Sequence, residues 1–210
     1  MLKEMICRYH PPPDKMEALD FLCSELISGD DTRAECASIK FKEYGFSGLE
    51  ALRILFKSSI PDHRWWVIRS ISSFELSDEI LADLLTGLED NCCEVRQAAA
   101  LAFLHKPSLA AAPALIERLS DSDPLTARLA SYALCELGRS VSNNLLVVLN
   151  NGKLTARVEA MRALSEIKDT RTISEIMKFL EDDSALVQHW AKEALDKMGV
   201  GMVYLDPSKG

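Results

Sequence analysis

Three absences narrow the class of this 210-residue chain. Its six cysteines form no C-x-x-C pair and follow no secretory leader, so we expect reduced thiols in a cytoplasmic protein. No run of about 18 apolar residues occurs, which excludes a transmembrane helix. The G-x-G-x-x-G and Walker loops of nucleotide-binding proteins and the G-x-S-x-G elbow of hydrolases are also missing, so no motif indicates those chemistries.

Basic residues are in the minority. The chain has 24 Lys and Arg against 32 Asp and Glu, a net charge of −8. This balance argues against general attraction to nucleic acid or to an anionic membrane. Hydrophobic residues make up 48% of the sequence, enough for one sizeable core. We therefore expect a globular chain with neither nucleic acid nor a membrane as its partner.

The sequence repeats itself in segments of about 30 residues. Two columns of mostly small residues and one column of large apolar residues recur, with successive members 33, 29, 31, 30 and 31 residues apart. The columns are Ala37, Ser70, Ala99, Ala130, Ala160 and Ala191; Lys40, Ser73, Ala102, Ala133, Ala163 and Ala194; and Phe41, Phe74, Phe103, Leu134, Leu164 and Leu195. Positions three, four and seven apart share a helical face, so each segment predicts an amphipathic helix that another helix approaches closely.

A second apolar-periodic segment precedes each of these helices, which predicts a helical hairpin as the repeating unit. Six hairpins are expected, at residues 15–44, 47–74, 77–104, 108–137, 139–167 and 170–198. Because one hairpin cannot bury its apolar stripe alone, neighbours must stack. The predicted fold is all-α: an α-solenoid of stacked helical hairpins. It forms one domain, residues 15–198, between an N-terminal extension, residues 1–14, and a C-terminal tail, residues 199–210.

Particular residues mark the ends of these helices. Gly138 and Gly199 follow the predicted second helices, where glycine often ends a helix. Asp90, Asp121 and Asp182 follow the predicted first helices at matching places. An aspartate there is predicted to cap the N-terminus of the next helix.

Three motifs connect the repeat to a known family. Residues Ala111–Asp123 read A-x-P-x-L-I-x-x-L-x-D-x-D, and residues 130–138 read A-S-Y-A-L-C-E-L-G. Val95, Arg96 and Ala99 supply the V-R-x-x-A form of the signature. These motifs resemble the short HEAT-like repeats first associated with phycobilisome lyase subunits. The resemblance spans nearly the whole chain and is strongest in the last four hairpins. It implies a right-handed α-α superhelix of the armadillo or HEAT type, within a family of many functions.

Catalytic and metal-binding constellations are not found in the sequence. No histidine is followed by glutamate, so the chain lacks the paired His-Glu motifs of deoxyhypusine hydroxylase, a di-iron enzyme with HEAT-like repeats. No group of cysteines and histidines offers three or four ligands at zinc-like spacing. We predict no catalytic residue, no metal and no cofactor.

Cys92 and Cys93 are the remaining reactive candidates. A thiol at a helix N-terminus can become a nucleophile or a bilin attachment partner. The adjacent Glu94 opposes thiolate formation, and cysteine is commonly a small packing residue. The prediction favours packing and leaves reactivity open.

The second helices carry the residues predicted to bind a partner on the concave face. Tyr, Trp and Arg most often anchor protein interfaces, and several lie at groove-facing positions. The predicted contact residues are Gln97, Leu101, Arg128, Tyr132, Val158, Arg162, His189, Trp190 and Trp65. An alternative stays open, in which Arg96, Arg128 and Arg157 only form interhelix ion pairs with Asp121 and similar acids. Trp65 and Trp66 are neighbours on one helix, so one of them is predicted to be core.

These observations predict a non-catalytic HEAT-repeat scaffold or adaptor that binds a protein partner. One alternative is a bilin-lyase-like subunit that binds a tetrapyrrole-bearing protein. Another is a HEAT-fold DNA glycosylase, which the charge disfavours: the part before residue 106 has 11 basic and 18 acidic residues, and the rest has 13 and 14.

Overall fold

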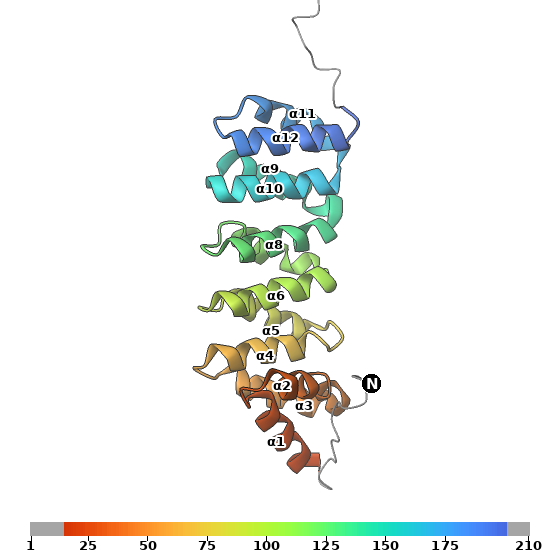
Figure 1. Cartoon of the computed structure of the whole chain (residues 1–210). Helices are drawn as coiled ribbons and strands as arrows, with labels where there is room; N and C mark the ends of the chain where they lie inside the picture. The colour runs from red at the N-terminus through yellow and green to blue at the C-terminus, as the bar shows by residue number, and fades with distance from the viewer. Residues whose placement is uncertain (1–14, 201–210) are drawn as a thin grey trace, which may run out of the picture. The chain divides into compact units, whose positions relative to one another are not determined.

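The computed structural model of the chain describes residues 15–200, in which helices alternate with short loops and no strand occurs (Figure 1). The all-α prediction is confirmed for this part of the chain. None of its helices is both long and apolar enough to cross a membrane. The predicted extension, residues 1–14, and positions 201–210 of the predicted tail lie outside the described residues.

The α-helices have the following bounds: Lys15–Leu26 (α1), Asp31–Ser38 (α2), Gly45–Phe56 (α3), Pro61–Ile71 (α4), Asp78–Leu88 (α5), Cys93–His105 (α6), Ala112–Arg118 (α7), Pro124–Glu136 (α8), Ser142–Asn151 (α9), Leu154–Ile167 (α10), Ile173–Met177 (α11) and Ala185–Lys197 (α12). Short 3-10 helices lie at Phe41–Tyr44 (η1), Leu109–Ala111 (η2), Gly138–Val141 (η3), Thr170–Thr172 (η4) and Lys178–Glu181 (η5).

Contacts divide the described residues into two compact units, a first unit that ends at Ala102 and a second unit that begins at Phe103. In the first unit, α1 packs against α2 and α3, while α4 contacts α2, α3 and α5. In the second unit, α7 packs against α8, and α10 contacts α8, α9 and α12. Each unit is therefore built of helices packed in adjacent pairs. One continuous repeat domain over residues 15–198 stays a prediction.

The repeated columns form the core of each unit. All six members of the first small column and all six of the large apolar column are buried. In the second small column Lys40 is only half-buried, as expected of its long charged side chain. Close approach is visible at Gly87 of α5, where a Cβ atom would lie 2.7 Å from Cδ1 of Ile68 and 3.0 Å from Cβ of Ala99. Small residues at these positions let the helices touch.

Helix starts follow from side chains that accept backbone N–H groups. Asp30, Ser77 and Asp123 cap α2, α5 and α8 in this way, satisfying donors that the helix cannot pair. After α8 and α12 the chain turns at Gly138 and Gly199, with φ of +60° and +80°, a region that glycine adopts without a steric penalty.

The three loop aspartates act differently from the sequence prediction. Asp90, Asp121 and Asp182 each accept the backbone N–H two residues later, at Cys92, Asp123 and Ser184, over 2.8, 2.9 and 2.9 Å. They therefore shape the loop before the helix, and the helix cap lies further along the chain. The prediction that they cap the helices themselves is wrong, because the loop extends beyond the aspartate before the first helical turn begins.

Candidate functional site

The nine predicted contact residues divide between the two units. Trp65 on α4 and Gln97 and Leu101 on α6 belong to the first unit, and each is half-buried or exposed. The second unit holds the other six, on α8, α10 and α12: Arg128, Tyr132, Val158, Arg162, His189 and Trp190. Of these, only Val158 is buried, with 8% of its surface exposed. Val158 therefore offers little surface to a partner, and the binding role of all nine residues stays a prediction.

Two arginines of the second unit share one buried carboxylate. Glu159 of α10 is 7% exposed. It accepts hydrogen bonds from Nε and Nη2 of Arg128 on α8, over 2.8 and 3.0 Å. Nε of Arg162 lies 3.4 Å from the same Glu159 carboxylate, but it is buried and has no hydrogen-bond partner within residues 15–200. Together the two arginines and one glutamate carry a net charge of +1.

Aromatic side chains border this trio on two sides. The guanidinium carbon of Arg162 lies 4.2 Å from the ring centroid of Trp190 on α12, a cation-π contact. His189 meets Trp190 edge to face, with ring centroids 5.3 Å apart. On the other side, Tyr132 is 40% exposed. Hydrogen bonds to Glu159 raise the pKa of Arg128, burial lowers it, and the Tyr132 hydroxyl raises it again, so the net shift is upward.

Other arginines form interhelix pairs, as the structural alternative predicts. Arg157 of α10 pairs with Asp182 in the loop before α12 and donates to the Leu149 carbonyl over 3.0 Å. In the first unit, Arg64 of α4 holds Asp90 with two 2.7 Å hydrogen bonds. These arginines tie one helix to the loop of the next hairpin.

Arg96 and Arg128 are the other two arginines that the alternative assigns to interhelix ion pairs. Arg96 donates to the Asp90 backbone carbonyl over 2.8 Å. Arg128 pairs with Glu159, 31 residues later, an interhelix pair with an acid as the alternative expects. Its interhelix pair is made with an acid on the facing helix, since Glu159 extends from α10 toward α8.

The cysteines of the described residues are free thiols. Cys92 and Cys93 donate to the Glu94 carboxylate over 2.8 and 3.2 Å. Burial, with nearby acidic residues, raises the pKa of Cys23 to about 11 and that of Cys135 to about 12. These last two thiols are therefore protonated at neutral pH and poor nucleophiles.

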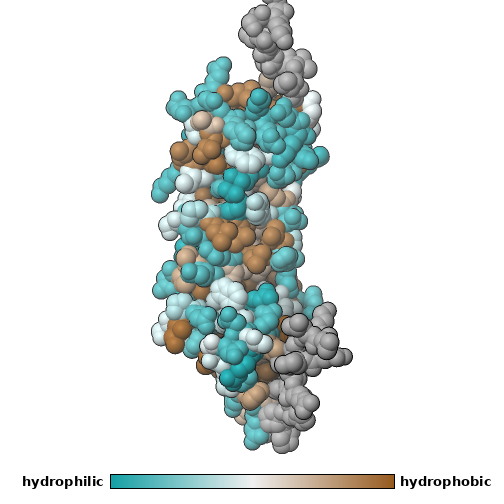
Figure 2. Space-filling model, in the orientation of Figure 1, coloured by the Kyte–Doolittle hydropathy of each residue, from teal (hydrophilic) through white to brown (hydrophobic). Residues whose placement is uncertain are grey.

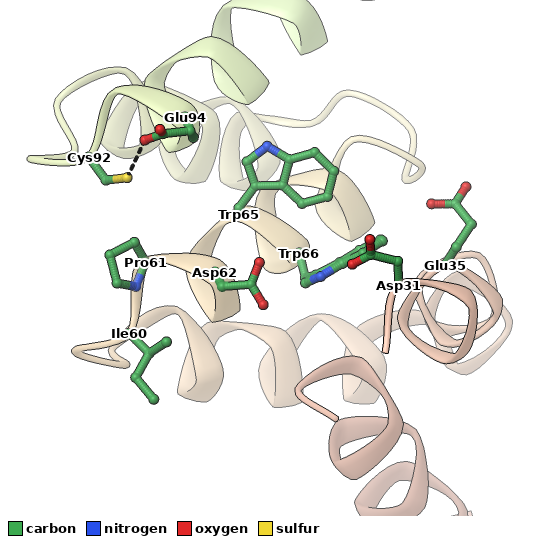
Figure 3. Close-up of a pocket in the computed structure, with 9 residues that line it drawn as sticks. All are labelled: Asp31, Glu35, Ile60, Pro61, Asp62, Trp65, Trp66, Cys92 and Glu94. Atoms are coloured by element: carbon green, nitrogen blue, oxygen red, sulfur yellow. Dashed lines mark hydrogen bonds between the residues drawn. The ribbon is translucent and has the colours of Figure 1, made fainter. Parts of the chain in front are cut away.

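The first unit contains a pocket of about 800 Å³, between α2, α4 and the start of α6 (Figure 3). It is lined by Asp31, Glu35, Ile60, Pro61, Asp62, Trp65, Trp66, Cys92 and Glu94. Sequence reasoning missed the pocket as a site, because its carboxylates come from three separate elements. The usable signal was the Trp65-Trp66 pair, two large aromatic residues in succession on one helix.

The two tryptophans have different surroundings within this pocket. Trp66 is 6% exposed and belongs to the core, whereas Trp65 is half-buried, so the prediction that one of them is core is confirmed. Their rings nevertheless meet edge to face, with centroids 4.8 Å apart and planes at 90°. Neighbouring residues on one helix thus both contribute to the lining of one cavity.

A comparison with protein families locates one repeat in the sequence. The model of the PBS lyase HEAT-like repeat matches residues 156–182, which run from α10 to the loop before α12. No curated protein matches the sequence.

Three solved structures match this chain in part. Two are engineered proteins, both 19% identical to this chain: one has a TM-score of 0.47 and covers 87% of this chain and 97% of its own, and the other has 0.49, 87% and 99%. The third is human deoxyhypusine hydroxylase in complex with glycerol, with a TM-score of 0.49, 18% identity, and coverage of 88% of this chain and 75% of its own. The resemblance read from the sequence is confirmed, and the chain carries a PBS lyase HEAT-like repeat at residues 156–182.

Proposed function

We propose that this chain is a non-catalytic HEAT-repeat scaffold that binds a protein partner on the face formed by α8, α10 and α12. The observation that carries the proposal is the Arg128-Glu159-Arg162 trio with its aromatic borders. Two guanidiniums held by one carboxylate leave a positive charge beside Tyr132 and Trp190. Such a combination of arginine with tyrosine and tryptophan is typical of interface anchors.

The surface of this face supports a protein partner. In Figure 2 the second unit presents separate apolar groups among hydrophilic ones over α8, α10 and α12. Leu125, Leu154 and Leu186 are exposed at the starts of these three helices. A mixture of apolar groups and a few oriented charges resembles the general make-up of transient protein interfaces.

The chemistry of the trio indicates which group of the partner would bind there. The Arg162 side chain is 18% exposed, and its guanidinium is already stacked and oriented by Trp190. A carboxylate of the partner would accept from a guanidinium that has lost little freedom on binding. The proposal includes a cytoplasmic location, which the free thiols of the described cysteines support.

The test compares partner capture by matched variants. The tagged chain and its Tyr132→Ala/Arg162→Gln variant are incubated with native extract at moderate salt, and bound proteins are identified by mass spectrometry. Val147→Ala is the control, because Val147 is exposed on α9, outside the proposed face. We expect one stoichiometric protein bound by the wild type and the control, and lost from the double variant.

Other outcomes separate the alternatives. Capture of the same protein by a folded double variant would remove this face from consideration. A coloured eluate would favour the bilin-lyase-like alternative, and recovery of nucleic acid without protein would favour a glycosylase. An absorbance scan of the eluate distinguishes these results.

A further inference from the structure

We propose that the pocket of the first unit binds the side chain of an arginine on a partner peptide. The pocket lies among α2, α4 and the start of α6, and its lining combines two tryptophan rings with carboxylates (Figure 3). Its volume of about 800 Å³ is within the usual range of ligand pockets. It belongs to a different unit from the face proposed above, so either site can exist without the other.

The tryptophans favour a flat, weakly hydrated cation. The rings of Trp65 and Trp66 stand at 90° with centroids 4.8 Å apart, and both residues line the cavity. Trp66 is buried in the core, with 6% of its surface exposed, while Trp65 is half-buried. Tryptophan gives the strongest cation-π attraction of the aromatic side chains, and a guanidinium stacks on it as a planar group.

Two carboxylates of the lining are available for a cation. Asp31 and Asp62 are exposed, lie in the first turns of α2 and α4, and form no ion pair within residues 15–200. In Figure 3 they flank Trp66. The other acids of the pocket are engaged: Glu35 pairs with Arg69 over 2.8 Å, and Glu94 accepts from Cys92.

The net charge of the first unit also favours a cationic ligand. The sequence before residue 106 carries 11 basic and 18 acidic residues, a net charge of −7. A surface of one sign attracts ligands of the other and speeds their association.

Arginine fits this lining better than other organic cations. Its N–H groups can donate to both carboxylates, which a quaternary ammonium group cannot do. Its planar head can stack on tryptophan more fully than the compact ammonium of lysine. Ile60 and Pro61 complete the lining with apolar surface, against which the methylene groups of arginine can pack.

The experiment uses the full chain and fluorescence of the pocket tryptophans. The chain has three tryptophans, so a Trp190→Phe background leaves Trp65 and Trp66 as the reporters. N-acetyl-arginine amide is titrated in, and N-acetyl-citrulline amide, which has nearly the same shape but no charge, serves as the ligand control. We expect saturable binding of the arginine compound that weakens with added salt, and no saturable binding of the citrulline compound.

A pair of variants tests the carboxylates. Asp31→Asn/Asp62→Asn is expected to weaken arginine binding about tenfold, since each exposed ion pair contributes modestly. Asp78→Asn is the matched control, because Asp78 is also exposed and also lies in the first turn of a helix, α5, but outside the pocket. Circular dichroism checks that the variants are folded.

Each result decides the proposal. Binding of arginine with the expected loss in the double variant, and none in Asp78→Asn, supports it. Equal binding of citrulline, equal loss in Asp78→Asn, tighter binding of tetramethylammonium than of arginine, or no saturation by arginine would each overturn it.

Discussion

Replacing Glu159 by glutamine should destabilise the second unit by about 2 kcal/mol. Glutamine keeps the shape of the side chain, so the change removes mainly its charge. Breaking a fully buried ion pair costs about 3–5 kcal/mol, but the Arg128 side chain is 32% exposed, so water replaces part of the lost interaction. Loss of the 3.4 Å contact with Arg162 adds to the cost. For a chain of this size the expected fall in melting temperature is about 4–8 °C.

The assay is urea unfolding followed by circular dichroism, with a matched control on the same helix. Glu166 of α10 pairs with Lys197 over 2.7 Å but is exposed, so Glu166→Gln should cost less than about 0.5 kcal/mol. Adding Arg128→Met to Glu159→Gln should recover part of the loss, because the unpaired guanidinium is removed. Equal effects of the two glutamate substitutions would refute the reasoning that burial makes the Glu159 pair important.

Two further predictions concern the first unit. Gly87→Ala should destabilise the folded state by about 1–3 kcal/mol, despite the higher helix propensity of alanine. The reason is that the new Cβ would lie 2.7 Å from Cδ1 of Ile68 and 3.0 Å from Cβ of Ala99. An unfolding midpoint at or above that of the wild type would contradict this prediction. Burial raises the pKa of Asp90. Its hydrogen bonds, first that from Arg64, lower the pKa by more than burial raises it, so the net shift is downward. The stabilisation by the Asp90 carboxylate is therefore present above about pH 4 and is lost as the pH falls through the lowered pKa. The stability difference between wild type and Asp90→Asn should then shrink in acid. Urea titrations at neutral and acid pH measure this difference.

The repeat and its core could be predicted from the sequence because they depend on periodicity. Members of the small column such as Ala99 and Ala160 are buried at each repeat, as the spacing of small and large residues indicates. Gly138 turns the chain where its position predicts a helix end. The loop aspartates were misassigned, because aspartate serves both as a helix cap and as a loop-shaping residue two positions earlier. The sequence alone does not distinguish these two roles.

The side-chain sites could be predicted only in part. Arg128 and Arg162 were recognised as candidates, but their shared partner Glu159 was not, because it lies on the buried side of α10. The pocket escaped prediction for another reason: Asp31 and Asp62 line the same pocket but are 31 residues apart in the sequence, and each is an ordinary helix-start residue by itself. Contacts between hairpins cannot be read from the pattern within one hairpin.

The loop aspartates also make neighbouring hairpins dependent on each other in one direction along the chain. The carboxylate of Asp182 shapes the loop before α12, yet the arginine that grips it, Arg157, belongs to the preceding hairpin. Asp90 and Arg64 have the same relation in the first unit. A hairpin duplicated or transplanted elsewhere would carry its aspartate but leave the matching arginine behind. Recombination of such repeats therefore keeps a well-formed loop only when the preceding helix moves with it, or when the new neighbour supplies an arginine at the same place.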